Sequence, residues 1–137
     1  MIVADTGAML GLLDAGDRHH ASLRELYDAR PAAWVLPWAI LPEVDYLAGA
    51  ELGPAAQDAF LADLVSGAFR VEWGRQDDLS AAQRLCRKYR SLRLGLVDAL
   101  VMATAERLGP EAIATTDLRD FGAVSLKGQP KLYPRDL

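Results

Sequence analysis

Asp98 is the single charged residue in a stretch of apolar residues and glycine, LGLVDALVMA, at residues 94–103. The stretch is typical of a helix that becomes buried. An isolated carboxylate there would lose its hydration and shift its pKa toward the neutral form, so it normally has a cation or several hydrogen-bond donors beside it. The sequence therefore raises the question of what lies opposite Asp98.

Three more acids have positions that suit shared chemistry: Asp5, Glu43 and Asp117 each follow a short apolar segment that is typical of a buried strand. Any one of them, like Asp98, could simply cap or complement the start of a helix. If the segments are parallel strands, however, their carboxyl ends meet at one edge of the sheet, where ligands gather. Carboxylates crowded there would repel one another unless they held a hard cation such as Mg²⁺ or Mn²⁺, which prefers oxygen ligands.

The elements that must position these acids alternate between strand-like and helical patterns. Strands are expected at 1–4, 32–36, 69–73 and 112–115, with a final edge strand at 124–126 or 131–133. Helices are expected at about 7–13, 18–29, 38–52, 55–66 and 77–89, and around Asp98 as far as Gly109, with a short turn or helix at 117–121. This alternation predicts an α/β fold, a three-layer α/β/α sandwich with a mostly parallel central sheet.

Length and composition limit the classes of protein that fit. A chain of 137 residues with 51% hydrophobic content can form one core, so we expect a single domain over residues 1–137. No apolar run approaches the roughly 20 residues of a membrane span, and no basic region precedes a cleavable apolar segment, so we expect a cytoplasmic protein. The single cysteine, Cys86, excludes an internal disulfide.

A basic stripe contrasts with the formal net charge of −4. Within residues 84–93 no acid accompanies the five basic residues Arg84, Arg87, Lys88, Arg90 and Arg93. Such a stripe could contact nucleic-acid phosphates through charge and counterion release. The charge pattern alone favours a solvated helix face over a nucleic-acid contact.

Four segments, taken in order, resemble the PIN-domain nucleases, and most closely the VapC-type toxins of bacterial toxin–antitoxin pairs. They are VADTGAML around Asp5, ILPEVDYL around Glu43, LGLVDALVMATAERL around Asp98 and IATTDLRDF around Asp117. The resemblance covers nearly the whole chain and implies an endoribonuclease that depends on Mg²⁺ or Mn²⁺ and cuts structured RNA such as tRNA or rRNA. The products would carry a 5′-phosphate and a 3′-hydroxyl. The resemblance also implies a homodimer that a cognate VapB-type antitoxin inhibits.

The resemblance further implies roles for individual residues. The family's acidic quartet, catalytic and metal-ligating, corresponds to Asp5, Glu43, Asp98 and Asp117, while Thr6 and Thr116 match small hydroxyl residues that support the ligands. Metal ions held by the quartet would bind the scissile phosphate, lower the pKa of a water and stabilise the developing charge. The basic stripe leads directly toward Asp98, which favours RNA binding over the solvated-face interpretation.

Two neighbouring acids leave alternatives open. Asp120, three residues beyond Asp117, could share or replace its role. Asp45 raises the same alternative beside Glu43, although residues two apart on a helix should not face the same way.

Two rival classes were compared with the nuclease hypothesis. A phosphatase of the haloacid dehalogenase type also has an Asp after its first strand, but it needs a second acid two residues later, where this chain has Gly7. A noncatalytic RNA- or protein-binding module on the same fold is the remaining alternative, and titration with Mn²⁺ would distinguish it from an enzyme.

The tryptophans could provide stacking surfaces for bases. Trp34 and Trp73 lie in strand-like segments, and we predict that both are in the core. Trp38 lies just past a strand end and near Glu43, which makes it the one candidate base platform.

Overall fold

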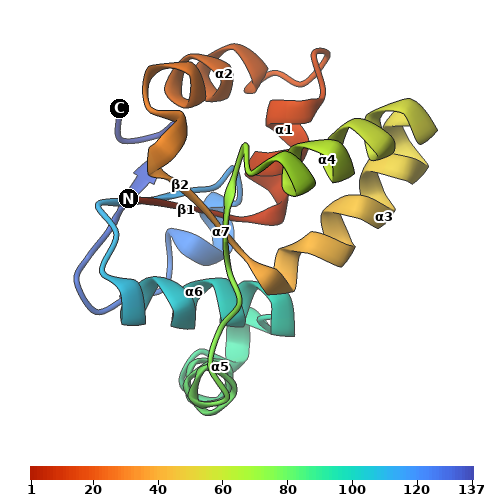
Figure 1. Ribbon diagram of the computed structural model, residues 1–137. Helices are drawn as coiled ribbons and strands as arrows, with labels where there is room; N and C mark the ends of the chain where they lie inside the picture. Colours follow the sequence, from red (N-terminus) through yellow and green to blue (C-terminus); the bar gives the residue numbers. More distant parts are fainter.

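A five-stranded, all-parallel sheet forms the centre of the computed structural model, which describes residues 1–137 (Figure 1). The strands are ordered β3-β2-β1-β4-β5. Their bounds are β1 Ile2–Ala4, β2 Trp34–Pro37, β3 Arg70–Glu72, β4 Ala112–Ala114 and β5 Lys131–Tyr133. The predicted parallel sheet is confirmed, and of the two segments proposed for the last edge strand it is 131–133 that forms β5.

Helices cover both faces of the sheet, which confirms the α/β/α sandwich. In Figure 1, α1 and α2 lie above the strands, and α5 and α6 lie below them. The helices are α1 Thr6–Leu13, α2 His20–Ala29, α3 Leu41–Leu52, α4 Pro54–Ser66, α5 Asp77–Lys88, α6 Leu96–Leu108 and α7 Leu118–Phe121. Short 3₁₀ turns are η1 Pro31–Ala33, η2 Trp38–Ile40 and η3 Arg90–Leu92. None of the helices combines the length and the apolar character needed to cross a bilayer.

The central strands are apolar along their whole length because helices bury them on both sides. Every residue of β1 and β4 is fully buried, as continuous apolar runs in parallel strands require. Ile2 pairs with Ala112, and Ala4 pairs with Ala114, so β1 and β4 end level with each other. This register brings the segments that follow the two strands to one edge of the sheet.

The helix predicted at 38–52 is divided into two parts. Trp38–Ile40 forms η2, and α3 begins at Leu41 with Pro42 in its first turn. A proline is tolerated there because the amide that it lacks has no partner within the helix.

The prediction that Trp73 is a core residue is wrong. Trp34 is fully buried as predicted, but the side chain of Trp73 is 73% exposed. β3 is an edge strand that ends at Glu72, so Trp73 follows the last paired residue and no helix covers it.

Arg107, near the end of α6, joins three elements through ion pairs. Its Nε lies 2.8 Å from Oδ1 of Asp78 on α5, and its Nη2 lies 2.9 Å from Oε1 of Glu72 at the end of β3. All three side chains are largely shielded from solvent. The hydrogen bonds from Arg107 hold the pKa of both carboxyl groups below their usual range. The network thereby fixes the turn between β3 and α5 against α6.

We expect the Arg107→Met variant to lose about 3 kcal/mol of unfolding free energy, because the buried carboxylate of Asp78 would be left without its cation. Urea denaturation at neutral pH measures the loss. The matched control is Arg24→Met, which breaks an exposed pair with Asp28 on α2 and should cost less than about 1 kcal/mol. Equal losses in the two variants would contradict a structural role for the network.

Candidate metal centre

Acids from distant parts of the chain meet at the carboxyl edge of the sheet. Asp5 directly follows β1, and Asp117 comes three residues after the end of β4. Glu43 lies in the first turn of α3, and Asp98 lies in the first turn of α6. The charges of Asp98 and Asp117 act on Asp5, and that of Glu43 acts on Asp98, so the four predicted acids share one electrostatic environment.

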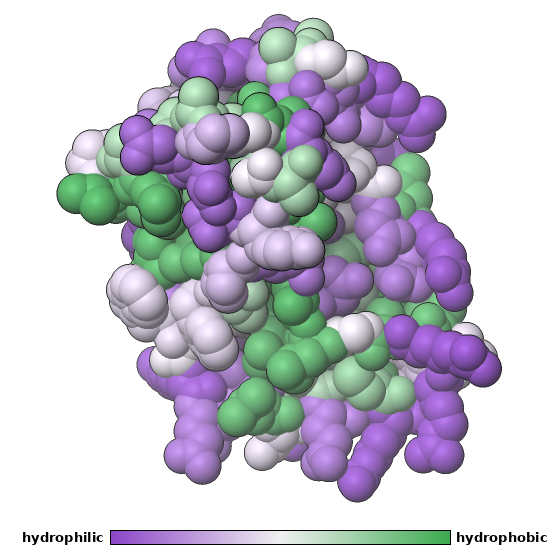
Figure 2. Space-filling view, turned by 90° about the vertical axis from the view of Figure 1, so that its right-hand side faces the viewer, coloured by the Kyte–Doolittle hydropathy of each residue, from purple (hydrophilic) through white to green (hydrophobic).

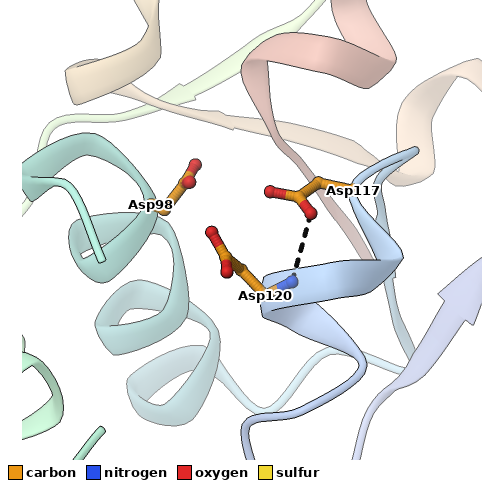
Figure 3. Close-up of side chains that lie close together, drawn as sticks. All are labelled: Asp98, Asp117 and Asp120. Carbon is orange, nitrogen blue, oxygen red and sulfur yellow. Dashed lines mark hydrogen bonds between the residues drawn. The ribbon is translucent and has the colours of Figure 1, made fainter. Parts of the chain in front are cut away.

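The tightest group consists of Asp98, Asp117 and Asp120 (Figure 3). One carboxylate oxygen from each residue lies within 4.8 Å of the other two. Asp117 and Asp120 approach from the start of α7, while Asp98 approaches from α6 on the opposite side. Asp120 is therefore a full member of this group, in addition to Asp117 rather than in place of it, whereas Glu43 lies outside it.

Asp117 also caps the helix that carries Asp120. Its Oδ1 accepts a hydrogen bond from the Asp120 amide at 3.1 Å, which satisfies a donor at the start of α7. The capping interpretation of Asp117 is therefore confirmed, and the same carboxylate also lies close to those of Asp98 and Asp120.

Asp5 is the most deeply buried of the acids, with only 3% of its surface exposed. Its Oδ1 accepts a hydrogen bond from the Ala8 amide at 2.7 Å, and its Oδ2 accepts one from the hydroxyl of Thr115. Burial raises the pKa of Asp5 to about 7, and the charges of Asp98 and Asp117 add to the increase, although the two hydrogen bonds oppose it. A protein without a cation at this edge therefore carries Asp5 partly protonated near neutral pH.

Asp98 shows the same effect at a half-buried position. Burial is the largest cause that raises its pKa to about 6, followed by the charges of Asp117, Asp120 and Glu43. Asp98 therefore faces other carboxylates, and no lysine or arginine contributes to the shift of its pKa.

The donor set fits a hard divalent cation. All three clustered side chains offer carboxylate oxygen, the ligand type that Mg²⁺ and Mn²⁺ prefer. Oδ1 of Asp120 is buried and has no hydrogen-bond partner, and the Nε of the exposed Arg119 lies 3.9 Å from it. A buried carboxylate oxygen without a partner is costly, and a bound cation would remove that cost.

The hydroxyl residues surround Asp5 in different ways. Thr6 is buried at the start of α1, and its hydroxyl has no hydrogen-bond partner. The hydroxyl of Thr116 lies 3.0 Å from the point where a Cβ on Gly7 would be, so it packs over the start of α1. Sequence reasoning missed Thr115, which binds Asp5 directly. Its only signal was a hydroxyl residue at the end of a buried strand, two residues before Asp117.

Asp45 does not join the acidic group. It follows Glu43 by two residues on α3, its carbonyl accepts a hydrogen bond from Gln57 on α4, and its Oδ1 is buried without a partner. The charge of Glu43 acts on Asp98, whereas that of Asp45 does not. This difference agrees with the expectation that Asp45 and Glu43 face different ways.

The basic stripe is exposed and free of ion pairs. It runs along α5 into the segment that leads to α6, and none of its five cations lies in a salt bridge. All five side chains are exposed, namely Arg84, Arg87, Lys88, Arg90 and Arg93. A polyanion could therefore contact them without displacing any carboxylate of the protein.

The fold and the acidic edge agree with the result of a family comparison. The sequence profile of the PIN domain matches residues 2–126. The chain therefore belongs to the PIN-domain family.

The proteins similar to this chain include ones named VapC. Ribonuclease VapC26 of Mycobacterium tuberculosis is 32% identical over 123 residues, which are 90% of this chain and 91% of that protein. The crystal structure of Mycobacterium tuberculosis VapC20, described as a toxin that cleaves the sarcin–ricin loop, superposes with a TM-score of 0.82 at 25% identity, and the match covers 93% of this chain and 98% of that one. The fold is also that of DNA-bound VapBC from Salmonella typhimurium, with a TM-score of 0.73 at 17% identity over 96% of this chain and 95% of that one.

Proposed function

We propose that this chain is the toxin of a VapBC-type pair, an endoribonuclease that depends on Mg²⁺ or Mn²⁺. The observation that carries the proposal is the convergence of three carboxylate oxygens from α6 and α7 within 4.8 Å of one another. The chain also resembles, over 90% of its length, a protein named as a ribonuclease, and this resemblance supports the same reaction.

The acids at this edge would hold the metal. We assign this role to Asp5, Glu43, Asp98, Asp117 and Asp120. When bound, the ion supplies positive charge that neutralises a scissile phosphate and lowers the pKa of an attacking water. The chain itself orients the acids: Thr115 fixes Asp5, and the cap on α7 fixes Asp117 relative to Asp120. Thr6 and Thr116 would support the ligands through their hydroxyl groups.

The proposed substrate is structured RNA, either tRNA or rRNA, in the cytoplasm. VapC20 is described as a toxin that cleaves the sarcin–ricin loop, which supports an RNA of this class. The test is incubation of the purified chain with total RNA and Mg²⁺ or Mn²⁺, followed by mapping of the ends that appear. New 5′-phosphate ends that vanish when a chelator is added would support the proposal, and intact RNA under every condition would refute it.

The basic stripe would hold the RNA backbone near the acids. Its cations are exposed and unpaired, and the segment that carries them continues into α6 just before Asp98. Phosphate contacts of this kind position a nucleic acid but do not read its sequence.

We expect the double variant Arg87→Ala, Arg90→Ala to bind RNA more weakly and with a flatter dependence on salt. If each arginine neutralises one phosphate, the plot of log binding constant against log salt concentration, whose slope is negative, should become less steep by about 1.5. Binding titrations at several salt concentrations measure this slope. The matched control is Arg24→Ala, Lys127→Ala, which removes two exposed cations outside the stripe. An unchanged slope in the first variant would return the stripe to the role of a solvated face.

The proposed partners are a VapB-type antitoxin and a second copy of the chain. The structural similarity to the toxin-antitoxin complex from Klebsiella pneumoniae, with a TM-score of 0.68, and to DNA-bound VapBC supports the first partner. For the homodimer, the support is an exposed apolar side of α4, where Leu61 and Val65 lie one turn apart and are 47% and 90% exposed.

A further inference from the structure

Two exposed tryptophans line a pocket beside the acidic edge. Trp38 follows β2, Trp73 follows β3, and their side chains are 43% and 73% exposed. Pro37 and Glu72, the residues just before them, are paired in the sheet. The two tryptophans therefore follow the ends of their strands at the same level of the sheet. The pocket has a volume of about 290 Å³, and Arg75, Leu79 and Leu100 also line it. The mechanism described above does not use this pocket.

The pocket and the acids share one edge of the sheet. β3, β2 and β1 are neighbours in that order, and Asp5 follows β1 as the tryptophans follow β2 and β3. With strands roughly 4.8 Å apart, Trp73 therefore emerges about 10 Å from Asp5 across the sheet. Leu100 lies on α6, the helix that also carries Asp98, although the two side chains are two residues apart and leave different faces of it.

The turn that presents Trp73 is fixed. The Gly74 amide donates to Oε1 of Glu72 at 3.2 Å, and the Arg75 amide donates to Oδ2 of Asp78 at 3.0 Å. The same two carboxylates are held by Arg107, so the turn is attached to α6. Gly74 has a φ of +82°, and a Cβ at this position would lie only 2.7 Å from Nε1 of Trp38. An exposed indole on a fixed turn loses little conformational entropy when it binds a ligand.

Cations flank the aromatic surface. Arg75 is exposed and lies in no salt bridge, and the basic stripe begins at Arg84 on α5, the helix that follows Arg75 in the chain. Figure 2, which views the molecule from the side of the acidic edge, shows apolar atoms gathered low on this face with hydrophilic side chains projecting below and beside them. Exposed Leu79 and Leu96 contribute to the apolar surface of α5 and α6. Indole rings beside unpaired cations match a nucleotide, which has a flat base and a phosphate.

We propose that the pocket between Trp38 and Trp73 binds an unpaired RNA base by stacking, with Arg75 on the adjacent phosphate. The inference rests on the proposed ribonuclease function and adds to it a subsite for a nucleotide near the cleaved bond. With this subsite, Trp38 and Trp73 would favour single-stranded RNA over paired RNA, because a base within a duplex cannot reach an indole face. An apolar protein segment would use the indoles but would leave the free cations unmatched.

The test uses Asp98→Asn protein without divalent ions, so that RNA stays intact and binding is separated from cleavage. The probes are a short single-stranded oligoribonucleotide and a strand of the same length without bases. We expect the strand with bases to bind about tenfold more tightly and to quench tryptophan fluorescence. Trp73→Ala should abolish this advantage without changing the affinity for the abasic strand, and Trp73→Phe should retain most of it. Tyr46→Ala, which removes an aromatic side chain that is 72% exposed on α3, is the matched control and should change nothing.

Three results would overturn the subsite. The first is equal affinity of the protein for the two strands. The second is an equal loss of affinity for both strands in Trp73→Ala. The third is a Trp73→Ala variant that binds a protein partner more weakly but binds RNA as the wild type does. Cleavage is measured separately with wild-type protein and total RNA. A protein that shows the base advantage but cuts no RNA would refute the proposed nuclease function and leave the stacking subsite in place.

Discussion

The Asp98→Asn variant is expected to fold normally and to lose RNA cleavage by on the order of a thousandfold or more. Asp98 is the member of the acidic group that comes from α6, and its carboxylate faces Asp117 and Asp120 across the cluster. Asparagine preserves its shape but removes the charge that a divalent cation requires. Cleavage of RNA under single-turnover conditions at saturating Mg²⁺ or Mn²⁺ measures the loss.

Stability provides a second readout for the same variant. Burial and three neighbouring acids raise the pKa of Asp98, so loss of its charge should leave the metal-free protein equally or more stable above pH 6. The matched control is Asp77→Asn, an exposed acid at the start of α5, which should retain full activity. A well-folded Asp98→Asn protein that still cuts RNA at the wild-type rate would show that the site lies elsewhere.

The metal-free protein should lose stability as the pH rises from about 5 to 7. Asp5 has a pKa of about 7 in the folded state against 3.8 ordinarily, so in this window the folded state retains a proton that the unfolded state releases. The free energy of unfolding therefore decreases with rising pH, by about 2 kcal/mol across this window. Asp98, whose pKa is raised to about 6, adds to the decrease in the same window, while Glu72 and Asp78, whose pKa values are lowered, titrate below it.

Denaturation in a chelator at several pH values measures this dependence. Asp5→Asn should reduce the pH dependence to the part that Asp98 contributes, whereas Asp58→Asn, which replaces an exposed acid on α4, should leave it unchanged. In the wild type, added Mn²⁺ should raise the melting temperature more at pH 8 than at pH 6, because the ion must displace the protons on the acids. If Mn²⁺ stabilised Asp5→Asn as much as the wild type, Asp5 would not be a ligand. If it stabilised neither protein, the noncatalytic alternative would be favoured.

The arrangement of the sheet could be predicted from the sequence because its central strands are continuous apolar segments. The runs that became β1, β2 and β4 are buried on both faces, and their alternation with helices permits few topologies. The same reasoning failed for Trp73, whose segment FRVEW alternates apolar and charged residues instead of being continuously apolar. The charged residues Arg70 and Glu72 suit the position of β3 at the edge of the sheet, where Trp73 is left exposed.

The acidic edge was predictable in outline and not in detail. Asp5, Glu43, Asp98 and Asp117 could be assigned to one edge because each follows a strand or begins a helix there. The membership of Asp120 depends on the direction of α7, a helix of only four residues whose pattern is too short to indicate which side faces α6. The contact of Thr115 with Asp5 joins residues 110 positions apart and depends on the register of β1 with β4.

One oxygen atom sets the separation of two acids in this protein. The hydroxyl of Thr115 donates a hydrogen bond to Asp5 and accepts one from the Asp117 amide at 3.0 Å. The residue that follows β1 and the segment that carries Asp117 are therefore joined through one hydroxyl group. Small movements of β4 relative to β1 are thereby transmitted to both carboxylates together. A side chain without a hydroxyl at residue 115 would remove both hydrogen bonds at once.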